Sequence, residues 1–440
     1  MKKQWSVIVL MYCFLSTAGW GQDTSRPLSL QDCIRIALDN NVTINTYRNL
    51  KKVADNNARS SYSSILPSVN TSFNGSSITD GPSEFVRQVQ EVDSATGMIV
   101  FVNERVPNPK QTRESYNFNL SVDQNIFDGG NWWNQIRRGK ADQNSADYDL
   151  TARTNETINT VAQGYFDLLK QEKLLEVNDL AVQRSQDNLD KTEQMFQIGS
   201  VAKIDVFRAR VNLGNDKISA ITQRNAVRNS RQTLNISMGL TPNNSIKIVK
   251  EFEFDYNLPP AENLVNTAFE NNPDLKRREF DIRSNELSVA ISKSAFLPSI
   301  GAFFRYDRNS SELDEIYSNF DQNWRTVVGL GLSYNLFNGF QDQVNVQNAK
   351  LQVRNSRLEL EDFKRNIQAN INILHNRYND LLEIVEINRA NLEAAREEYR
   401  LANERYRLGS GTSLDLREAQ VNLTDAERIL VVAEYDLIIT

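Results

Sequence analysis

The sequence is poor in the residues on which most catalytic and metal centres depend. Its 440 residues include a single histidine, His375, and two cysteines, Cys13 and Cys33. It contains no Walker phosphate-binding loop, no Ser-His-Asp order and no Cys/His cluster. We therefore expect no enzyme, no cofactor and no metal site. Only 18 glycines and 10 prolines are present, which favours long uninterrupted helices over a loop-rich fold.

Long apolar runs and an excess of positive charge are also missing. No stretch of 18 or more apolar residues follows the N-terminus, which argues against a membrane-spanning helix, and the net charge of −6 argues against binding to nucleic acid. Residues 1–21 have two lysines, an apolar run and then small residues, the pattern of a secretory signal peptide. Its removal would leave Cys33 alone, so we expect an exported protein without an intrachain disulfide.

The sequence contains an internal duplication, in which one unit occurs in two copies. The segment 196–213, FQIGSVAKIDVFRARVNL, is matched by 406–423, YRLGSGTSLDLREAQVNL. Identical residues recur at a constant offset of 409 − 199 = 210 positions, at Gly199/Gly409, Asp205/Asp415, Ala209/Ala419, Asn212/Asn422 and Leu213/Leu423. The same offset joins NIFDGG at 125–130 to NLFNGF at 335–340. The intervening segments have equal length in both copies, which indicates that geometry fixes that length.

A different offset covers the front of each copy. LPSV at 66–69 matches LPSI at 297–300, an offset of 298 − 67 = 231. The first copy therefore has 231 − 210 = 21 additional residues within 75–115, where Gly, Pro, Ser and charged residues predict a longer loop. Each copy is expected to contain a helix, two strands around a loop, a very long helix, a turn and a final helix. The predicted repeats are 22–238 and 261–440, joined by a linker at 239–260.

Period-2 alternation predicts four strands, at about 66–78, 116–127, 297–307 and 326–337. The second of these places apolar residues on one face, at Tyr116, Phe118, Leu120, Val122 and Ile126. Such segments, separated by a loop, are typical of a transmembrane β-hairpin, with a half-exposed soluble sheet as the alternative. Four strands cannot close a barrel, and open edges are not tolerated in lipid. A membrane-spanning sheet would therefore have to be shared between copies of the chain.

The segments predicted to be long helices, 131–238 and 340–440, repeat apolar residues at alternating steps of three and four. This spacing is typical of coiled-coil packing. At ~1.5 Å per residue, a helix from about 131 to 197 would be roughly 100 Å long. A helix of that length is far longer than those of a globular domain, and it is consistent with long helices packed side by side in one layer.

These features together resemble the TolC-like outer membrane factor family. The features that carry the resemblance are the signal peptide, the duplication, LPS before each strand pair, FDGG or FNGF after it, the helices of about 70 residues and the turn RYRLGSGTSLDL at 405–416. The resemblance implies a mainly α fold with a small transmembrane β part. It further implies a homotrimer whose twelve-stranded β-barrel in the outer-membrane lipid is continued by a long α-helical barrel in the periplasm.

By the same resemblance the protein would be a passive export duct, gated at its periplasmic tip, of a tripartite efflux or type I secretion system. Its partners would be a periplasmic adaptor (membrane fusion) protein and an inner-membrane transporter of the RND or ABC type. Two alternatives stay open: a periplasmic coiled-coil scaffold without a pore, and a secreted toxin or adhesin whose strands insert on contact with a target. The matched helix lengths speak against both. The exported substrate is not indicated by the sequence.

The resemblance also assigns roles to residues of the two turns. The hairpin tips that dock the adaptor would be Gly199, Ser200, Gly409 and Ser410. Asp415 and Glu418 fall on the acidic constriction of the entrance, and Asp205 and Tyr406 fall on positions that hydrogen-bond across hairpins in the closed state. The best-known member of that family has an arginine two residues after the second turn glycine; the position is Gly411 here, so this gate link has no arginine at that position.

A simpler interpretation of Asp415 and Glu418 comes from the residues alone. Asp415 would be a helix N-cap, and Glu418 an acid of the first turn favoured by the helix dipole. This interpretation and the constriction are compatible with each other.

Overall fold

The computed structural model describes residues 26–92, 94–95, 97–250 and 257–440; the predicted signal peptide lies outside this range. The chain forms two units, and each takes segments from both sequence copies. The helical unit comprises 26–48, 150–250, 257–272 and 365–440, and the sheet unit comprises 49–149 and 273–364.

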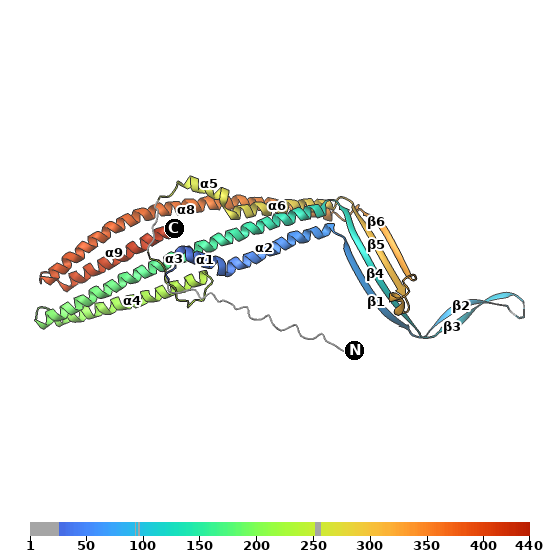
Figure 1. The fold of residues 1–440 in the computed structure, drawn as a ribbon, viewed down its shortest axis with the longest axis horizontal. Helices are drawn as coiled ribbons and strands as arrows, with labels where there is room; N and C mark the ends of the chain where they lie inside the picture. The colour runs from blue at the N-terminus through green and yellow to red at the C-terminus, as the bar shows by residue number, and fades with distance from the viewer. Residues whose placement is uncertain (1–25, 93, 96, 251–256) are drawn as a thin grey trace, which may run out of the picture. The chain divides into compact units, whose positions relative to one another are not determined.

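Two antiparallel hairpins of long helices dominate the helical unit (Figure 1). The first hairpin is α3 (Asn131–Gln197) with α4 (Lys203–Ser237), and the second is α8 (Gln341–Arg407) with α9 (Ser413–Ile439). Helices α3 and α8 both have 67 residues and begin 341 − 131 = 210 positions apart, so the duplication preserves helix length as expected. Among the described residues, no helix combines the length and apolarity needed to cross a bilayer.

Each copy begins with two helices where one is predicted. They are α1 (Leu30–Asn40) with α2 (Val42–Ser60), and α5 (Ala261–Asn271) with α6 (Pro273–Ser294). The breaks fall at Asn41 and Asn272, which occupy equivalent positions since 272 − 41 = 231. The Asn41 side chain accepts a hydrogen bond from the Thr43 amide at 2.8 Å and so starts a new helix. In the second copy Pro273 provides no N–H to continue the preceding helix.

The main core of the helical unit packs α1 against the middle of α3 and the end of α4. Its buried members include Cys33, Ile36, Val161, Leu168, Leu234, Met238, Ile246 and Ile248. Leu28 is bonded to the chain after α4, since its amide donates to the Lys247 carbonyl at 2.8 Å and its carbonyl accepts from the Val249 amide at 3.0 Å. The segment after α4 is therefore anchored to the start of the described chain.

Gly239 ends α4 at the edge of this core, and we expect Gly239→Ala to destabilise the helical unit. Its φ is +76°, and an added Cβ would lie 2.5 Å from the carbonyl oxygen of Asn40. Strain of this kind costs about 1–3 kcal/mol. Gly214, in the middle of α4 with nothing within 4 Å of a built Cβ, is the matched control. Gly214→Ala should raise stability by about 1 kcal/mol. Thermal unfolding followed by circular dichroism of both variants checks the opposite signs.

The sheet unit contains one four-stranded antiparallel sheet in the order β1-β4-β5-β6 (Figure 1). Its strands are β1 (Ser68–Asp80), β4 (Gln111–Asp128), β5 (Ser299–Ser310) and β6 (Trp324–Ser333). A 3-10 helix (Ser61–Ile65) precedes β1, and the short helix α7 (Asp314–Tyr317) lies between β5 and β6. Within the described chain, the outer edges of β1 and β6 have no partner strand.

The strand register gathers apolar side chains on one face of this sheet. That apolar face includes Val69, Phe73, Tyr116, Phe118, Leu120, Val122, Ile300, Phe304, Val328, Leu330 and Leu332. The opposite face includes Asn70, Ser72, Asn117, Asn119, Ser121, Asp307, Asn309, Gly329 and Gly331. One predicted position is wrong: a register shift between Asn125 and Phe127 makes Ile126 the extra residue, and Phe127 pairs with Ile300 instead.

The prediction that 75–115 is a loop is also wrong. Strands β1 and β4 extend into it, and the rest forms a two-stranded ribbon of β2 (Ser83–Val92) and β3 (Ile99–Asn108). Facing pairs such as Val89 with Val102 and an Arg87–Glu104 ion pair of 3.1 Å join the strands of the ribbon. Cross-strand pairs of both kinds stabilise antiparallel strands. The strand predicted over 326–337 ends at Ser333.

Candidate functional site

The two turns joining the long helices have the same backbone structure. Gly199 and Gly409 have φ of +77° and +73°, a conformation that glycine adopts without steric cost. In the first turn the Ser200 amide donates to the Met195 carbonyl at 2.8 Å, and in the second the Ser410 amide donates to the Arg405 carbonyl at 2.9 Å. These are the bonds of a Schellman helix end. The four predicted tip residues are exposed at these turns.

The helices that leave the turns begin differently in the two copies. Helix α9 starts with a capping box: the Thr412 side chain accepts from the Asp415 amide at 3.1 Å, and the Asp415 carboxylate accepts from the Thr412 amide at 3.1 Å. Thr412, and not Asp415, is thus the N-cap residue. In α4 the equivalent N-cap is Ala202, which has no side-chain acceptor. Asp205, the counterpart of Asp415, is therefore not used in a capping box.

Asp205 instead accepts a hydrogen bond from the other hairpin. The Ser413 hydroxyl at the start of α9 donates to Asp205 Oδ1 at 3.1 Å. Arg208 lies 3.6 Å from the same carboxylate oxygen. The position of Ser413 is occupied in the first copy by Lys203, since 413 − 210 = 203. The two turns therefore form an asymmetric pair, in which the second donates and the first accepts.

Tyr406, the second residue predicted to bond across hairpins, is buried between α8 and α3. Its hydroxyl lies 3.1 Å from the hydroxyl of Thr192, and the two side chains are 2% and 1% exposed. The ammonium of Lys191 lies 5.6 Å from the centre of the Tyr406 ring, within the range of a cation–π interaction. Burial, and next the charge of Arg407, lower the pKa of Lys191.

A third connection, which the sequence reasoning missed, lies one turn farther along α9. The Arg417 guanidinium donates to both carboxylate oxygens of Asp216 on α4, at 2.8 and 3.0 Å, and to the Ser185 hydroxyl on α3 at 3.2 Å. Both charged side chains are mostly buried. A bidentate pair of this kind fixes orientation as well as distance. Arg417 therefore joins α9 to both helices of the first hairpin.

A fourth connection is also an arginine–carboxylate pair, but its arginine comes from the first hairpin and its carboxylate from the second. Arg184 on α3 donates to the two carboxylate oxygens of Glu427 on α9 at 2.8 and 3.2 Å, and to the Thr424 hydroxyl at 3.0 Å. Both charged groups are about 15% exposed. Each hairpin thus supplies one arginine to the other. We call Arg417–Asp216 and Arg184–Glu427 the cross-hairpin ion pairs.

The remaining predicted residues, Asp415 and Glu418, take no part in these connections and are exposed. They are separated by three positions, which places them on the same side of α9. The bonds to Thr412, from its backbone first and its side chain next, lower the pKa of Asp415. Asp415 is therefore ionised at neutral pH. A cavity of about 150 Å³ lies between the hairpins, lined by residues that include Thr192, Asp205, Arg208, Ser413 and Arg417.

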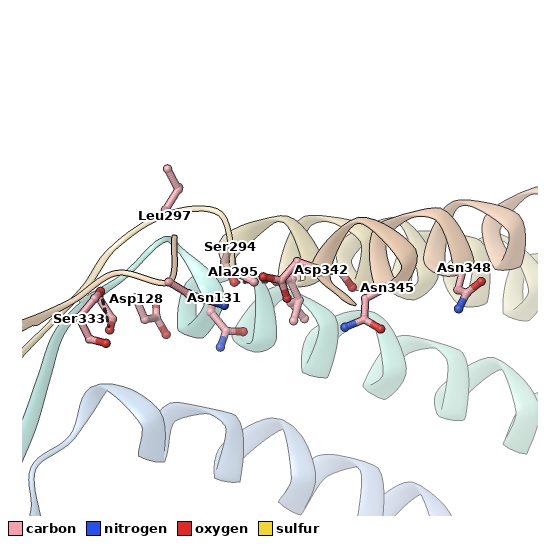
Figure 2. A pocket seen from close by; sticks show the side chains of 13 residues that line it. Asp128, Asn131, Ser294, Ala295, Leu297, Ser333, Asp342, Asn345 and Asn348 are labelled. Atoms are coloured by element: carbon pink, nitrogen blue, oxygen red, sulfur yellow. Dashed lines mark hydrogen bonds between the residues drawn. The ribbon is translucent and has the colours of Figure 1, made fainter. Parts of the chain in front are cut away.

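A separate polar pocket of about 680 Å³ lies in the sheet unit, where strands become helices (Figure 2). Its lining comes from the β4–α3 junction, the α6–β5 junction and the start of α8, and includes Asp128, Asn131, Ser294, Ser333, Asp342 and Asn345. Asp128 accepts from the Trp132 amide at 2.9 Å and so caps α3. Across the described part of the chain, no group of three or more acidic, histidine or cysteine side chains could hold a metal ion. The pocket is a polar recess.

Comparison with known proteins identifies the class of molecule that has this architecture. The family model described as outer membrane efflux protein matches residues 33–240 and 264–440. The outer membrane efflux protein BepC of Brucella suis biovar 1 is 29% identical over 172 residues, which are 39% of this chain and 36% of BepC. The outer membrane protein TolC of Salmonella enteritidis is 23% identical over 334 residues, 73% of this chain and 66% of TolC. The matched regions thus span about a third to two thirds of these relatives.

Solved structures of outer-membrane proteins have the same fold as this chain. The Campylobacter jejuni CmeC outer membrane channel superposes with a TM-score of 0.71 at 18% identity, over 99% of this chain and 92% of CmeC. The outer membrane protein VceC of Vibrio cholerae superposes with a TM-score of 0.75 at 14% identity, over 93% of this chain and 94% of VceC. The chain therefore belongs to the outer membrane efflux protein family and is a TolC-like protein of the outer membrane.

Proposed function

We propose that this protein is the outer-membrane channel-tunnel of a tripartite efflux or type I secretion system. The observation that carries the proposal is the four-stranded sheet with one apolar face and two open edges. Unpaired strand edges in hydrocarbon leave several backbone groups without hydrogen bonds, each at a cost of several kcal/mol. Copies of the chain remove both edges if β6 of one copy pairs with β1 of the next. Three copies would form a twelve-stranded barrel wide enough for a channel.

The first test is the oligomeric state. Because an isolated sheet of this kind has two unpaired edges, the protein extracted from outer membranes in detergent should have the mass of a homotrimer. Light scattering coupled to size exclusion, corrected for bound detergent, measures that mass. A monodisperse monomer with native helix and strand content would contradict the proposal. A trimer that shows no conductance in a planar bilayer would favour the alternative, a coiled-coil scaffold without a pore.

We further propose that the two turns form the gated periplasmic end of the duct. In a trimer, six helical hairpins would surround the entrance, with Asp415 and Glu418 as an acidic ring and the connections described above among those that hold the closed state. Arg417 supplies a cation to the first hairpin, although the family's gate arginine is replaced by Gly411. The exposed tips Gly199, Ser200, Gly409 and Ser410 would dock a periplasmic adaptor that links the duct to an inner-membrane RND or ABC transporter.

Tyr406→Phe and Asp205→Ala should each increase conductance. Each variant removes one hydrogen bond between hairpins, with Thr192 and with Ser413 respectively. A bond of this kind contributes about 1 kcal/mol, which corresponds to roughly a fivefold shift in the ratio of open to closed states. Single-channel recording measures the conductance and the ratio of open to closed states. Tyr399→Phe, in the same helix but packed in the α8–α9 core, is the control and should conduct like the parent protein. Unchanged conductance in both test variants would remove these residues from the gate.

A further inference from the structure

The connection between β5 and β6, residues 311–323, folds back over the apolar face of the sheet. Arg308, near the end of β5, pairs with Phe118 on β4 and with Trp324 on β6, so its side chain leaves the sheet on the apolar face. It is nevertheless only 1% exposed. Residues of the connection cover it, and we call this segment the β5–β6 loop.

Arg308 holds the β5–β6 loop in place through its guanidinium group. Its Nη2 donates to the carbonyl oxygens of Glu315 at 2.6 Å, Ser318 at 2.7 Å and Asn319 at 3.1 Å. The guanidinium carbon lies 4.7 Å from the centre of the Phe320 ring. Hydrogen bonds from a charged donor are stronger than those between neutral groups. One buried side chain thus bonds to α7 and to the two residues that follow it.

Further contacts within the β5–β6 loop make it a defined structure. The Glu315 carboxylate accepts from the Ser310 hydroxyl, and from the Asn323 amide at 3.2 Å. The indole N–H of Trp324 donates to the Asp321 carbonyl at 3.3 Å. Ile316 is buried beneath α7. These bonds join residues of the loop to one another and to the adjoining ends of β5 and β6.

The outer side of the loop is unusually apolar for a segment in water. Large hydrophobic side chains of the loop and of the first residue of β6 are 44% to 67% exposed, namely Leu313, Tyr317 and Phe320 in the loop and Trp324 on β6. They are mostly aromatic, and two of them carry a polar group on the ring. Tyrosine and tryptophan are enriched where a membrane meets water, because one end of the side chain is apolar and the other is hydrated.

The position of the loop along the sheet matches such a boundary. From Ser299, where β5 leaves the helical end of the sheet unit, to Arg308 is 308 − 299 = 9 residues. At ~3.3 Å per residue and a tilt of ~40°, this spans roughly 23 Å along the membrane normal, close to the ~25 Å apolar band of outer-membrane barrels. The β5–β6 loop therefore begins where hydrocarbon gives way to headgroups. The exposed apolar residues of the loop are therefore continuous with the apolar face of the sheet.

We propose that the β5–β6 loop is a lipid anchor at the headgroup boundary of the leaflet away from the helices. Leu313, Tyr317 and Phe320 enter the boundary, and Arg308 is the positioning residue that folds the loop onto the lipid side of the sheet. The proposal rests on the proposed function in one respect, that the sheet spans the membrane. Its partner is the lipid surface itself, with no protein required.

Tryptophan quenching by brominated lipids tests the anchor. The full-length protein is prepared with Trp132, Trp133 and Trp324 replaced by Phe, and Tyr317→Trp is added as the only reporter outside the leader. It is reconstituted in phosphatidylcholine vesicles brominated either near the headgroup or deep in the acyl chain. We expect at least twofold stronger quenching by the shallow bromines, and little quenching by aqueous iodide.

A second reporter separates the anchor from the proposed function. Val328→Trp in the same background lies on the apolar face of β6, and deep bromines should quench it if the sheet spans the bilayer. If they do not, the proposed function fails. If Val328→Trp is quenched while Tyr317→Trp responds only to iodide, the sheet spans the membrane but the anchor is wrong.

The role of Arg308 is tested by adding Arg308→Met to each reporter. Release of the loop should reduce lipid quenching of Tyr317→Trp by half or more and increase its quenching by iodide. The Val328→Trp signal should stay unchanged, which shows that the sheet is still inserted. Lipid quenching of Tyr317→Trp that survives Arg308→Met would overturn the positioning role.

Discussion

If the protein is the proposed channel, multivalent cations should block it, and Asp415→Asn combined with Glu418→Gln is expected to abolish most of that block. The two carboxyl side chains lie on one side of α9 and are exposed, and the pKa of Asp415 is lowered by its bonds to Thr412. Three chains would bring six such charges to one narrow entrance. Like charges in a confined opening attract counter-ions strongly. We expect the double variant to weaken block by about tenfold or more, equivalent to at least ~1.4 kcal/mol of binding free energy, and to lose cation selectivity in bilayer recordings.

The substitutions keep the shape of both side chains, which matters because Asp415 also takes part in the capping box. Thr412→Val is the matched control, since it removes the N-cap acceptor but changes no charge. It should cost about 1 kcal/mol of helix stability and leave the block intact. If the double variant retains parental selectivity and block, Asp415 and Glu418 do not line the pore. The capping box would then be the whole role of Asp415.

The architecture was predictable because it follows from patterns that repeat over many residues. The offset of 210 positions predicts long helices of equal length in the two copies, and α3 and α8 have the same length. Local signals were less reliable. Gly81 and Pro82 favour a turn, but the chain does not reverse there, because the pairing of β1 with β4 gives way to the pairing of β2 with β3 across these two residues. Glycine and proline here mark an interruption between two strand pairs, and strand structure continues on both sides of it.

The connections between hairpins could not be predicted from local patterns, because polar contacts across long sequence separations leave no periodic signal. A comparison of the two copies would have found several of them. Six connecting residues have apolar counterparts at the offset of 210, in the pairs Tyr406/Phe196, Thr192/Ala402, Arg417/Phe207, Asp216/Ala426, Arg184/Ala394 and Ser185/Ala395. A duplicated helix pair needs the same apolar core in both copies. A polar residue in one copy only is therefore a candidate for contact between the copies.

Loss of both cross-hairpin ion pairs is expected to open the entrance more than any single hydrogen-bond variant. Arg184→Ala with Arg417→Ala leaves Glu427 and Asp216 mostly buried without their partners. Removing one member of a fully buried pair costs about 3–5 kcal/mol, but the cost per pair is smaller here because these four side chains are 15% to 21% exposed. Movement of the second hairpin away from the first would expose both carboxylates to water. We expect the ratio of open to closed states to rise on the order of a hundredfold, measured as open probability and conductance in planar bilayers.

Ion pairs within a single hairpin provide the control for this experiment. Arg389 pairs with Glu434 between α8 and α9 at 3.0 Å, and Arg210 pairs with Glu193 between α3 and α4 at 2.9 Å. Arg389→Ala with Arg210→Ala removes the same charge and the same number of guanidinium groups. Because neither pair joins the two hairpins, this variant should conduct like the parent protein, and equal opening in both double variants would show that loss of positive charge opens the entrance.

A charge exchange decides whether the contact itself holds the closed state. Arg417→Asp with Asp216→Arg reverses one cross-hairpin ion pair and leaves the net charge unchanged. Each single variant places two like charges together and should open the channel, whereas the exchange should restore most of the closed population. The Ser185 hydroxyl can accept from a guanidinium and donate to a carboxylate, so it remains a partner in both arrangements. Conductance that stays high after the exchange would mean that Arg417 acts through something other than Asp216.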